Sequence, residues 1–292
     1  MVFFNIRTSR FLNLFAFLAI IAINVLGIVL PLGGVYIGQD RPSALLPDPI
    51  AFFMWGLVYF MMLLFIIYQL IPSTYQLAYI NYGITPFFTF HALCNGGWII
   101  AQAYAPKSKP WIQLIIMYTL LISVATMYTR VYSIARKDLV NKEGSDDKFY
   151  LNYLFGRLWL SFYLAWAVCT SSFDLFHLIY EGSPETYSNA ALMFGGIGFL
   201  TLIVLNVTRD SAFGLTIIWS GIWLAVACID RIGGFSPSDD PLLLCSVAVT
   251  GAVALGTLFT LALNVVFCVN RFRFLREENM KMRKPVGFSD VA

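Results

Sequence analysis

Eight long apolar runs occupy most of the chain, and no water-soluble fold has room to bury that much apolar surface. Each run has about the 20 residues that a helix needs to cross the roughly 30 Å hydrocarbon core of a bilayer. Membrane-spanning helices are therefore the first expectation. The runs are residues 11–38, 50–71, 84–104, 111–135, 153–179, 189–208, 212–229 and 242–269.

The composition argues against any soluble domain. Of the 292 residues, 59% are apolar and only 12% are charged, whereas soluble domains carry about 25% charged residues. The runs are continuously apolar rather than alternating, and lipid requires each segment to satisfy its own backbone hydrogen bonds. We therefore predict an all-α membrane protein with eight transmembrane helices. The fifth span is the least regular because it contains Arg157 and Asp174. The first run is too long for a signal-peptide core and is expected to be retained.

Lysine and arginine are unevenly distributed between the two ends of these spans. If eight helices alternate in direction, fourteen Lys and Arg residues fall on the side that holds both termini, and four fall on the other. Basic residues favour the cytoplasmic side of a membrane. This bias predicts that both termini face the cytosol or its equivalent, and it favours an even number of spans. The basic tail, residues 271–292, is expected to anchor this topology, with contact to anionic lipid as the alternative.

Motifs of soluble enzymes are missing from the sequence. It has no phosphate-binding glycine loop, no GxSxG and no HExxH. We therefore expect no catalytic residue, no metal site and no required cofactor. The five cysteines lie within spans, without CxxC spacing, and are expected to be buried small residues.

Small residues inside the later spans are expected to let helices approach closely. One group is a glycine cluster in the sixth span, and the other is a stripe in the last span that recurs every four residues. These residues are Gly195, Gly196 and Gly198, then Ala248, Ala252, Gly256, Thr260 and Asn264.

Polar and aromatic side chains share one helical face in each of three spans. Polar groups at membrane depth are costly, so they mark either contacts between helices or a binding site. Interhelical hydrogen bonding with interfacial aromatics is one interpretation. The other is a shared pocket for a flat, mostly apolar ligand with a few polar handles. The residues are Trp55 and Tyr59, then His91, Asn95 and Trp98, then Tyr163 and Trp166.

Short motifs on these faces resemble those of tryptophan-rich sensory proteins, the relatives of the mitochondrial translocator protein (the TspO/MBR-like family). Pro47 precedes a W-x-x-x-Y pattern similar to the opening of that family's second helix. The N-x-x-W that ends at Trp98 resembles its third helix, and the Y-x-x-W that ends at Trp166 resembles its fifth. The stretch from Arg157 to Trp166 is similar to R-L-P-F-S-I-Y-L-G-W of longer bacterial members.

Those longer members carry extra C-terminal helices, and their seventh helix starts with an Asp and reaches a Trp, as Asp210 and Trp219 do here. The chain also departs from the family pattern. His91 stands in place of a Gln, Phe162 in place of a Pro, and Asp174 in place of an Asn. These changes fall in the family's ligand pocket.

The resemblance implies three parts: a TspO-like five-helix core over residues 1–180, three additional transmembrane helices over residues 181–270, and the tail over residues 271–292. It also implies an integral membrane binding or sensing protein whose pocket takes a porphyrin, haem or a sterol-like lipid. The expected ligand-binding residues are Trp55, Tyr59, His91, Asn95, Trp98, Tyr163 and Trp166.

The pocket is expected between the second, third and fifth spans, opening away from the termini beneath the proline-containing loop 39–49. His91 has the chemistry to ligate haem iron, although a neutral, hydrogen-bonded histidine is the simpler expectation. Arg157 is expected to point into the bundle or toward the basic side. Asp174 is expected near the opposite side, beside Arg231.

A non-catalytic structural subunit of a larger membrane complex is the main alternative, because the loops are short and no charged relay is visible. A transporter is less favoured, since no pair of broken helices is found, and an enzyme is least favoured. Expected partners are membrane lipids and a tetrapyrrole or sterol. A homodimer or association with other membrane subunits stays open, and no nucleic acid is expected.

Overall fold

The protein is helical throughout the part that the structure, a computed structural model, describes: residues 6–29, 45–104, 111–141, 152–180, 186–232 and 241–282. No strand occurs within these residues, which agrees with the predicted all-α class. The helices are α1 (Ile6–Val29), α2 (Phe53–Gln69), α3 (Thr85–Tyr104), α4 (Trp111–Asn141), α6 (Leu158–Tyr180), α7 (Thr186–Thr208), α8 (Ser211–Ile232) and α9 (Pro241–Met282).

Short helical turns join or extend several of these helices. A 3₁₀ turn, η1 (Pro49–Phe52), leads into α2, and the Asp48 carboxylate accepts a hydrogen bond from the Ile50 amide at 2.9 Å. Such a cap satisfies one of the free amides at a helix start. A second 3₁₀ turn, η2 (Pro72–Thr74), follows α2. Two π-helical turns, η3 (Tyr79–Ile84) and η5 (Asn152–Arg157), precede α3 and α6.

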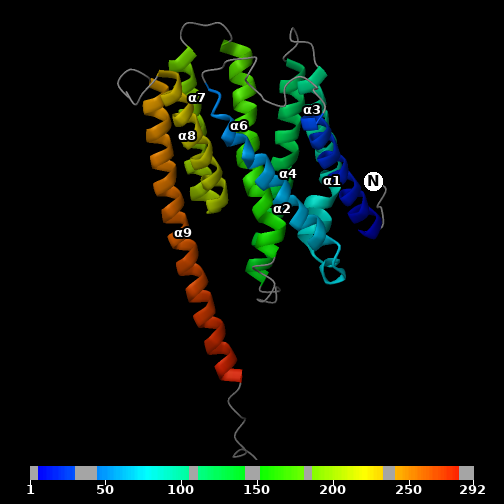
Figure 1. Ribbon diagram of the computed structural model, residues 1–292. Helices are drawn as coiled ribbons and strands as arrows, with labels where there is room; N and C mark the ends of the chain where they lie inside the picture. The colour runs from blue at the N-terminus through cyan, green and yellow to red at the C-terminus, as the bar shows by residue number, and fades with distance from the viewer. Residues whose placement is uncertain are drawn as a thin grey trace, which may run out of the picture.

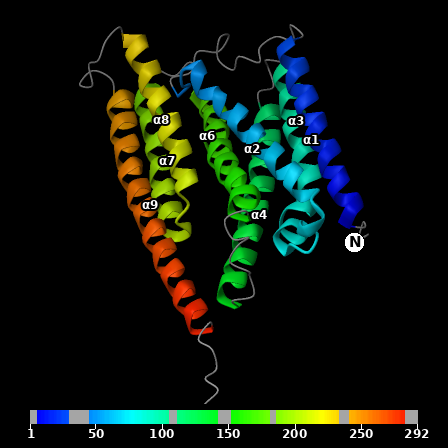
Figure 2. The same cartoon turned by 60° about the horizontal axis from the view of Figure 1, so that its bottom comes forward.

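The helices stand side by side in two groups (Figures 1 and 2). In the first, α1, α3, α4 and α6 pack in that order, and α2 crosses them obliquely against α6 and α1. In the second, α9 packs on α7 and α8, and α8 connects the group to α6. The start of α1 and the end of α9 lie toward the same, lower end in Figure 1, as an even number of spans requires. Which side of a membrane that end faces remains a prediction.

Seven described helical segments are long and apolar enough to cross a membrane, and α3 is the described helix of comparable length that falls short. The sequence pointed instead to the fifth span as the weakest, yet the segment Tyr153–Ile179 qualifies. The low mean hydropathy of α3 has a physical cause. It carries His91 and Asn95, both fully buried, whereas its outward residues Phe90 and Leu93 are apolar.

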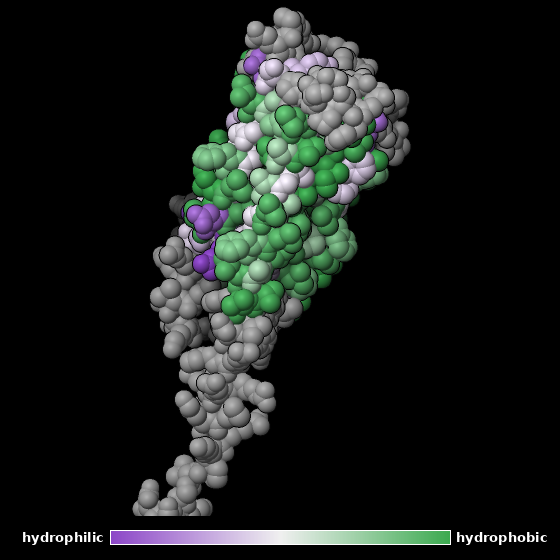
Figure 3. Space-filling view, turned by 90° about the vertical axis from the view of Figure 1, so that its left-hand side faces the viewer, coloured by the Kyte–Doolittle hydropathy of each residue, from purple (hydrophilic) through white to green (hydrophobic). Residues whose placement is uncertain are grey.

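The outer surface of the bundle is apolar, as a lipid-facing surface must be. Figure 3 shows hydrophobic residues covering much of the described surface on the side of α9. At least half of the side chains of Leu192, Phe199, Leu255 and Phe259 is exposed. In water such a contiguous patch would drive association, so this face is suited to acyl chains.

The predicted stripe of small residues on α9 lies only partly at an interface. Ala248 and Ala252 are exposed, whereas Thr260 is buried. A step of four residues turns an α-helix by about 400°, so the stripe drifts by about 40° per step. The close contacts lie beside it: a Cβ atom added to Gly198 or Gly214 would lie 2.4 Å from Val249 or 2.1 Å from Thr257, respectively. Of the predicted glycine cluster, Gly196 faces open space.

Arg10 of α1 ties the end of α2 to the connection that follows it, although it is fully buried. Its guanidinium donates to the carbonyl of Gln69, to the hydroxyl and carbonyl of Thr74 (2.8 Å each) and to Asn81 Oδ1 (2.8 Å). The face of Tyr75 lies 4.8 Å from the cation. All four acceptors are uncharged, and carbonyls at a helix C-terminus carry partial negative charge that favours a cation.

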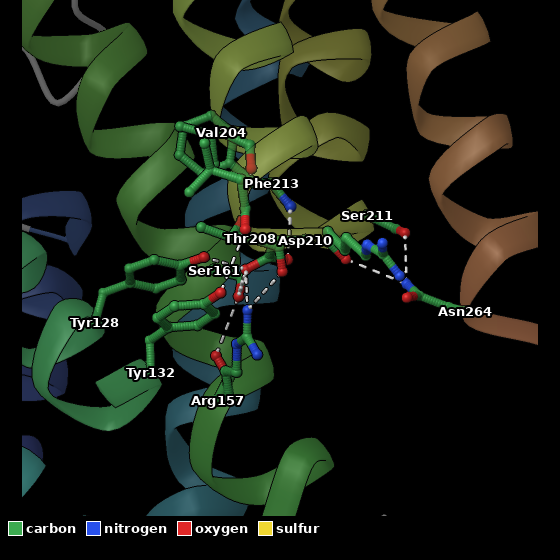
Figure 4. A network of polar contacts seen from close by, with 12 residues as sticks. Tyr128, Tyr132, Arg157, Ser161, Val204, Thr208, Asp210, Ser211, Phe213 and Asn264 are labelled. Atoms are coloured by element: carbon green, nitrogen blue, oxygen red, sulfur yellow. Dashed lines mark hydrogen bonds and ion pairs between the residues drawn. The ribbon is translucent and has the colours of Figure 1, made fainter. Parts of the chain in front are cut away.

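A second arginine, mostly buried, joins the two groups of helices (Figure 4). Arg157, the last residue of η5 and directly before α6, lies 3.7 Å from the Asp210 carboxylate in the two-residue turn between α7 and α8. That carboxylate is fully buried and also accepts from Tyr128 of α4 at 2.7 Å and Ser161 of α6 at 2.6 Å. Arg157 thus points into the bundle, as expected. The partner role of Asp210 was not foreseen.

Replacing Asp210 with Asn is predicted to lower the thermal unfolding midpoint of the protein in detergent. Removing one partner strands a largely buried charge, at a cost of about 3–5 kcal/mol for a fully buried pair and less here, because 17% of the Arg157 side chain is exposed. Asp230→Asn is the matched control, because Asp230 is exposed near the end of α8, the helix that follows Asp210. Equal midpoints for the two variants would show that the ion pair does not hold the groups together.

Candidate functional site

The seven residues expected to line a ligand site form one cluster at the centre of the first helix group. Trp55 of α2 lies in the middle. Its ring centroid is 5.7 Å from those of Tyr59 and Trp98, 5.4 Å from that of Tyr163 and 6.3 Å from that of Trp166. His91 and Asn95 of α3 join the cluster through Tyr163: the His91 and Tyr163 rings are 4.7 Å apart, and the Asn95 amide donates to the Tyr163 hydroxyl at 2.5 Å.

The helical spacing of these residues explains why they converge. Positions three, four and seven apart lie on one side of an α-helix, so α2, α3 and α6 each turn one stripe inward. The α3 and α6 members of the cluster are at most 5% exposed. Trp55 and Tyr59 are half-buried, so the α2 side is where the cluster approaches the protein surface.

A chain of hydrogen bonds crosses the bundle beside the rings. The Tyr59 hydroxyl lies 3.3 Å from Asn24 Oδ1 on α1 and 3.1 Å from Asn95 Oδ1 on α3, and Asn95 continues the chain to Tyr163 on α6. Four helices therefore contribute one polar side chain each. Asn24 was missed from the sequence, although a lone amide deep in an apolar run is the signal that polar residues in lipid provide.

His91 is a hydrogen-bonded histidine, and its bonds indicate which ring nitrogen carries the proton. Its Nδ1 lies 3.1 Å from the Ser123 hydroxyl on α4, and that hydroxyl donates its single proton to the Leu120 carbonyl at 2.7 Å. Ser123 can therefore only accept from His91, which places the proton on Nδ1. Nε2 is left with a free lone pair, and it is buried without a partner among the residues that the structure describes.

Two more nitrogens of the cluster lack partners among the described residues. Nε1 of Trp55 and Nε1 of Trp166 are buried and donate no hydrogen bond to any residue that the structure describes. Leaving a buried polar group unpaired costs about 1–3 kcal/mol. Single unpaired indole nitrogens also occur on Trp159 and Trp223, but three unpaired nitrogens lie together in this cluster. The cluster thus offers two donors and one acceptor to a bound molecule.

Trp98 connects the cluster to Asp174 near the end of α6. Its Nε1 donates to the Asp174 carboxylate at 3.4 Å, a long contact. The predicted neighbour of Asp174, the side chain of Arg231, lies outside the residues whose side chains the structure describes. Part of the predicted lid, residues 39–44, also lies outside the described chain. The remainder is packed: Leu45 and Pro47 are buried, and the Asp48 amide donates to the Trp223 carbonyl of α8 at 3.1 Å.

The rings of the cluster are in contact with one another. A flat ligand stacked between two rings needs about 7 Å between them, which is twice the 3.5 Å contact distance of carbon atoms. The centroids around Trp55 are closer than that, at 5.4–6.3 Å, and the rings of Tyr163 and Trp166 meet that of Trp55 nearly at right angles, at 87° and 86°. In this structure the cluster is therefore closed, and a stacked ligand would have to part and turn the rings.

Among the described residues, no three His, Cys, Asp or Glu side chains lie close enough together to bind a metal ion. Four of the five cysteines are described there, all with free thiols: Cys94, Cys169, Cys228 and Cys245.

The fold and the cluster define a multi-pass helical membrane protein with an aromatic and polar site inside a helix bundle. The family described as TSPO-like protein matches residues 10–263, a range that includes all seven cluster residues and extends into α9. The chain belongs to this family, which confirms the resemblance drawn from its motifs. No curated protein and no solved structure matches the chain significantly.

Proposed function

We propose that this protein is a non-catalytic binding or sensing protein, whose aromatic cluster takes a tetrapyrrole or a sterol-like lipid from the membrane. The observation that carries the proposal is the combination of seven converging residues with three unpartnered nitrogens: Nε1 of Trp55, Nε1 of Trp166 and Nε2 of His91. Single unpaired indole nitrogens also occur on Trp159 and Trp223. What supports a ligand site is that three such atoms lie within one cluster of converging rings.

The polar atoms fit the chemistry of these ligands. The free lone pair on His91 Nε2 suits a pyrrole N–H or a sterol hydroxyl, either of which donates a hydrogen bond. It also suits the iron of a haem, since neutral imidazole nitrogen is a common iron ligand. The stacking faces of Trp55 and Trp166 match a flat ring system. No cofactor is proposed as a requirement for folding.

We further propose that α3 is the eighth transmembrane helix and that both termini face the cytosol. The placement of α3 between α1 and α4 supports this, because its polar residues are buried and an apolar face is left for lipid. The clustering of basic residues at the end that holds both termini supports the orientation.

A structural subunit of a larger membrane complex is the second candidate. The closed packing of the rings favours it, because rings that fill one another's space stabilise a bundle without any ligand. Association with other membrane proteins, or with a second copy of the chain, belongs to this alternative.

Replacing both Trp98 and Trp166 with Leu is predicted to weaken binding of protoporphyrin IX by at least about fivefold, since each aromatic contact is worth about 0.5–1.5 kcal/mol beyond its area. Quenching of the remaining tryptophan fluorescence measures the affinity. Trp111→Leu, at a half-exposed position at the start of α4, is the control. Because Trp→Leu leaves a cavity, Trp166→Phe is tested alongside: it keeps the ring, removes the free donor and should weaken binding less.

Two outcomes would contradict the proposed site. One is a double variant that binds protoporphyrin IX as tightly as the parent. The other is a parent that binds neither protoporphyrin IX nor cholesterol, which would leave the structural-subunit role, and stoichiometric co-purification of other membrane subunits would then support it.

Tags at the two ends of the chain are predicted to have the same protease accessibility in sealed vesicles, because eight spans return the chain to its starting side. In vesicles with the cytosolic side outward, both tags should be cleaved. Cleavage of only one tag would mean an odd number of spans.

A further inference from the structure

The start of α2 is hydrogen-bonded to α8, a helix outside the five-helix core. The indole Nε1 of Trp219 donates to the Ala51 carbonyl at 3.0 Å. One turn further along α8, the Trp223 carbonyl accepts from the Asp48 amide at 3.1 Å. Both contacts act on residues 48–51, the segment that leads directly into α2.

This segment controls the position of two rings in the aromatic cluster. Phe52 follows Ala51 directly, and its ring meets that of Trp166 edge-on at 5.6 Å. Trp55, at the centre of the cluster, lies one helical turn after Ala51. Moving the start of α2 away from α6 would therefore separate both rings from Trp166, which is the movement that a stacked ligand requires.

The helix that holds this segment is itself fixed to the core. Asp210, immediately before α8, bonds to Tyr128 of α4 and Ser161 of α6. Trp219 lies nine residues later, about 13.5 Å along the helix at 1.5 Å per residue. Because the start of α8 is fixed to α4 and α6 through Asp210, α8 is not free to move with α2. The bond from Trp219 to Ala51 therefore opposes movement of the start of α2.

We infer that Trp219 is a positioning residue of the ligand site, and that its bond to Ala51 holds the start of α2 in the closed arrangement until a flat ligand from the membrane parts the rings. The inference rests on the proposed binding function. It assigns Asp210, directly before α8, the role of anchoring that helix, and Trp219, within α8, the role of holding α2. Without this bond the open arrangement is more populated, and apparent affinity rises with the population of the binding-competent state.

The test is Trp219→Phe, which keeps an aromatic ring next to Trp223 (centroids 5.5 Å apart) and removes the N–H donor together with part of the indole, a loss of volume that the control below shares. It should bind protoporphyrin IX about threefold to tenfold more tightly than the parent, the range expected for loss of one hydrogen bond from the closed state, and it should bind faster. Trp223→Phe is the matched control, because the Trp223 Nε1 is buried without a partner and its loss should leave affinity unchanged.

The sign of the effect separates positioning from general structural damage, which would weaken binding. An affinity of Trp219→Phe equal to or below that of the parent overturns the inference and leaves the proposed function intact. Hydrogen exchange of the ligand-free protein supplies a readout that does not depend on binding. The amides of residues 48–55 should exchange faster in Trp219→Phe and not in Trp223→Phe. Unchanged exchange also overturns the inference, even if the parent binds no porphyrin.

Discussion

A polar group inside a bilayer has no water to bond with, so it has to find its partner within the protein. The described bundle is organised by this constraint. Arg10 satisfies the end of α2, and Asp210 connects α4, α6 and the turn before α8. Asn95 stands in a chain that crosses from α1 to α6. Apolar packing alone discriminates weakly between helices in lipid, and these bonds specify which helices are neighbours.

Several buried polar atoms lack a partner among the described residues, and three of them lie in the aromatic cluster. Around it the polar chain is satisfied, yet the free nitrogens of Trp55, Trp166 and His91 are not. A packed core gains nothing from unpaired polar atoms, whereas a binding site needs them to orient a ligand. The contacts between the rings stabilise the bundle without a ligand. Under the proposed function, binding would exchange these ring–ring contacts for contacts between the rings and the ligand.

Much of this arrangement could be predicted from the sequence because helical geometry is local. The spacing of His91, Asn95 and Trp98 fixes a common face wherever α3 packs, and the motifs that carry the family resemblance lie on the same faces. What could not be predicted depends on contacts between distant segments. The pairing of Arg157 with Asp210 joins positions 53 residues apart, and nothing local to either residue identifies the other. The predicted stripe on α9 lies only partly at an interface, because a repeat of four drifts around a helix of 3.6 residues per turn.

A structure of the protein with protoporphyrin IX bound in a lipid environment tests the account most directly. We expect the porphyrin to lie between Trp55 and Trp166, with the two rings turned from their present edge-on contact (86°, centroids 6.3 Å apart) toward parallel and their centroids at least about 7 Å apart. A polar or metal atom of the ligand should then meet His91 Nε2. A porphyrin bound elsewhere, with the rings around Trp55 still in mutual contact, would contradict the assignment of this cluster as the ligand site.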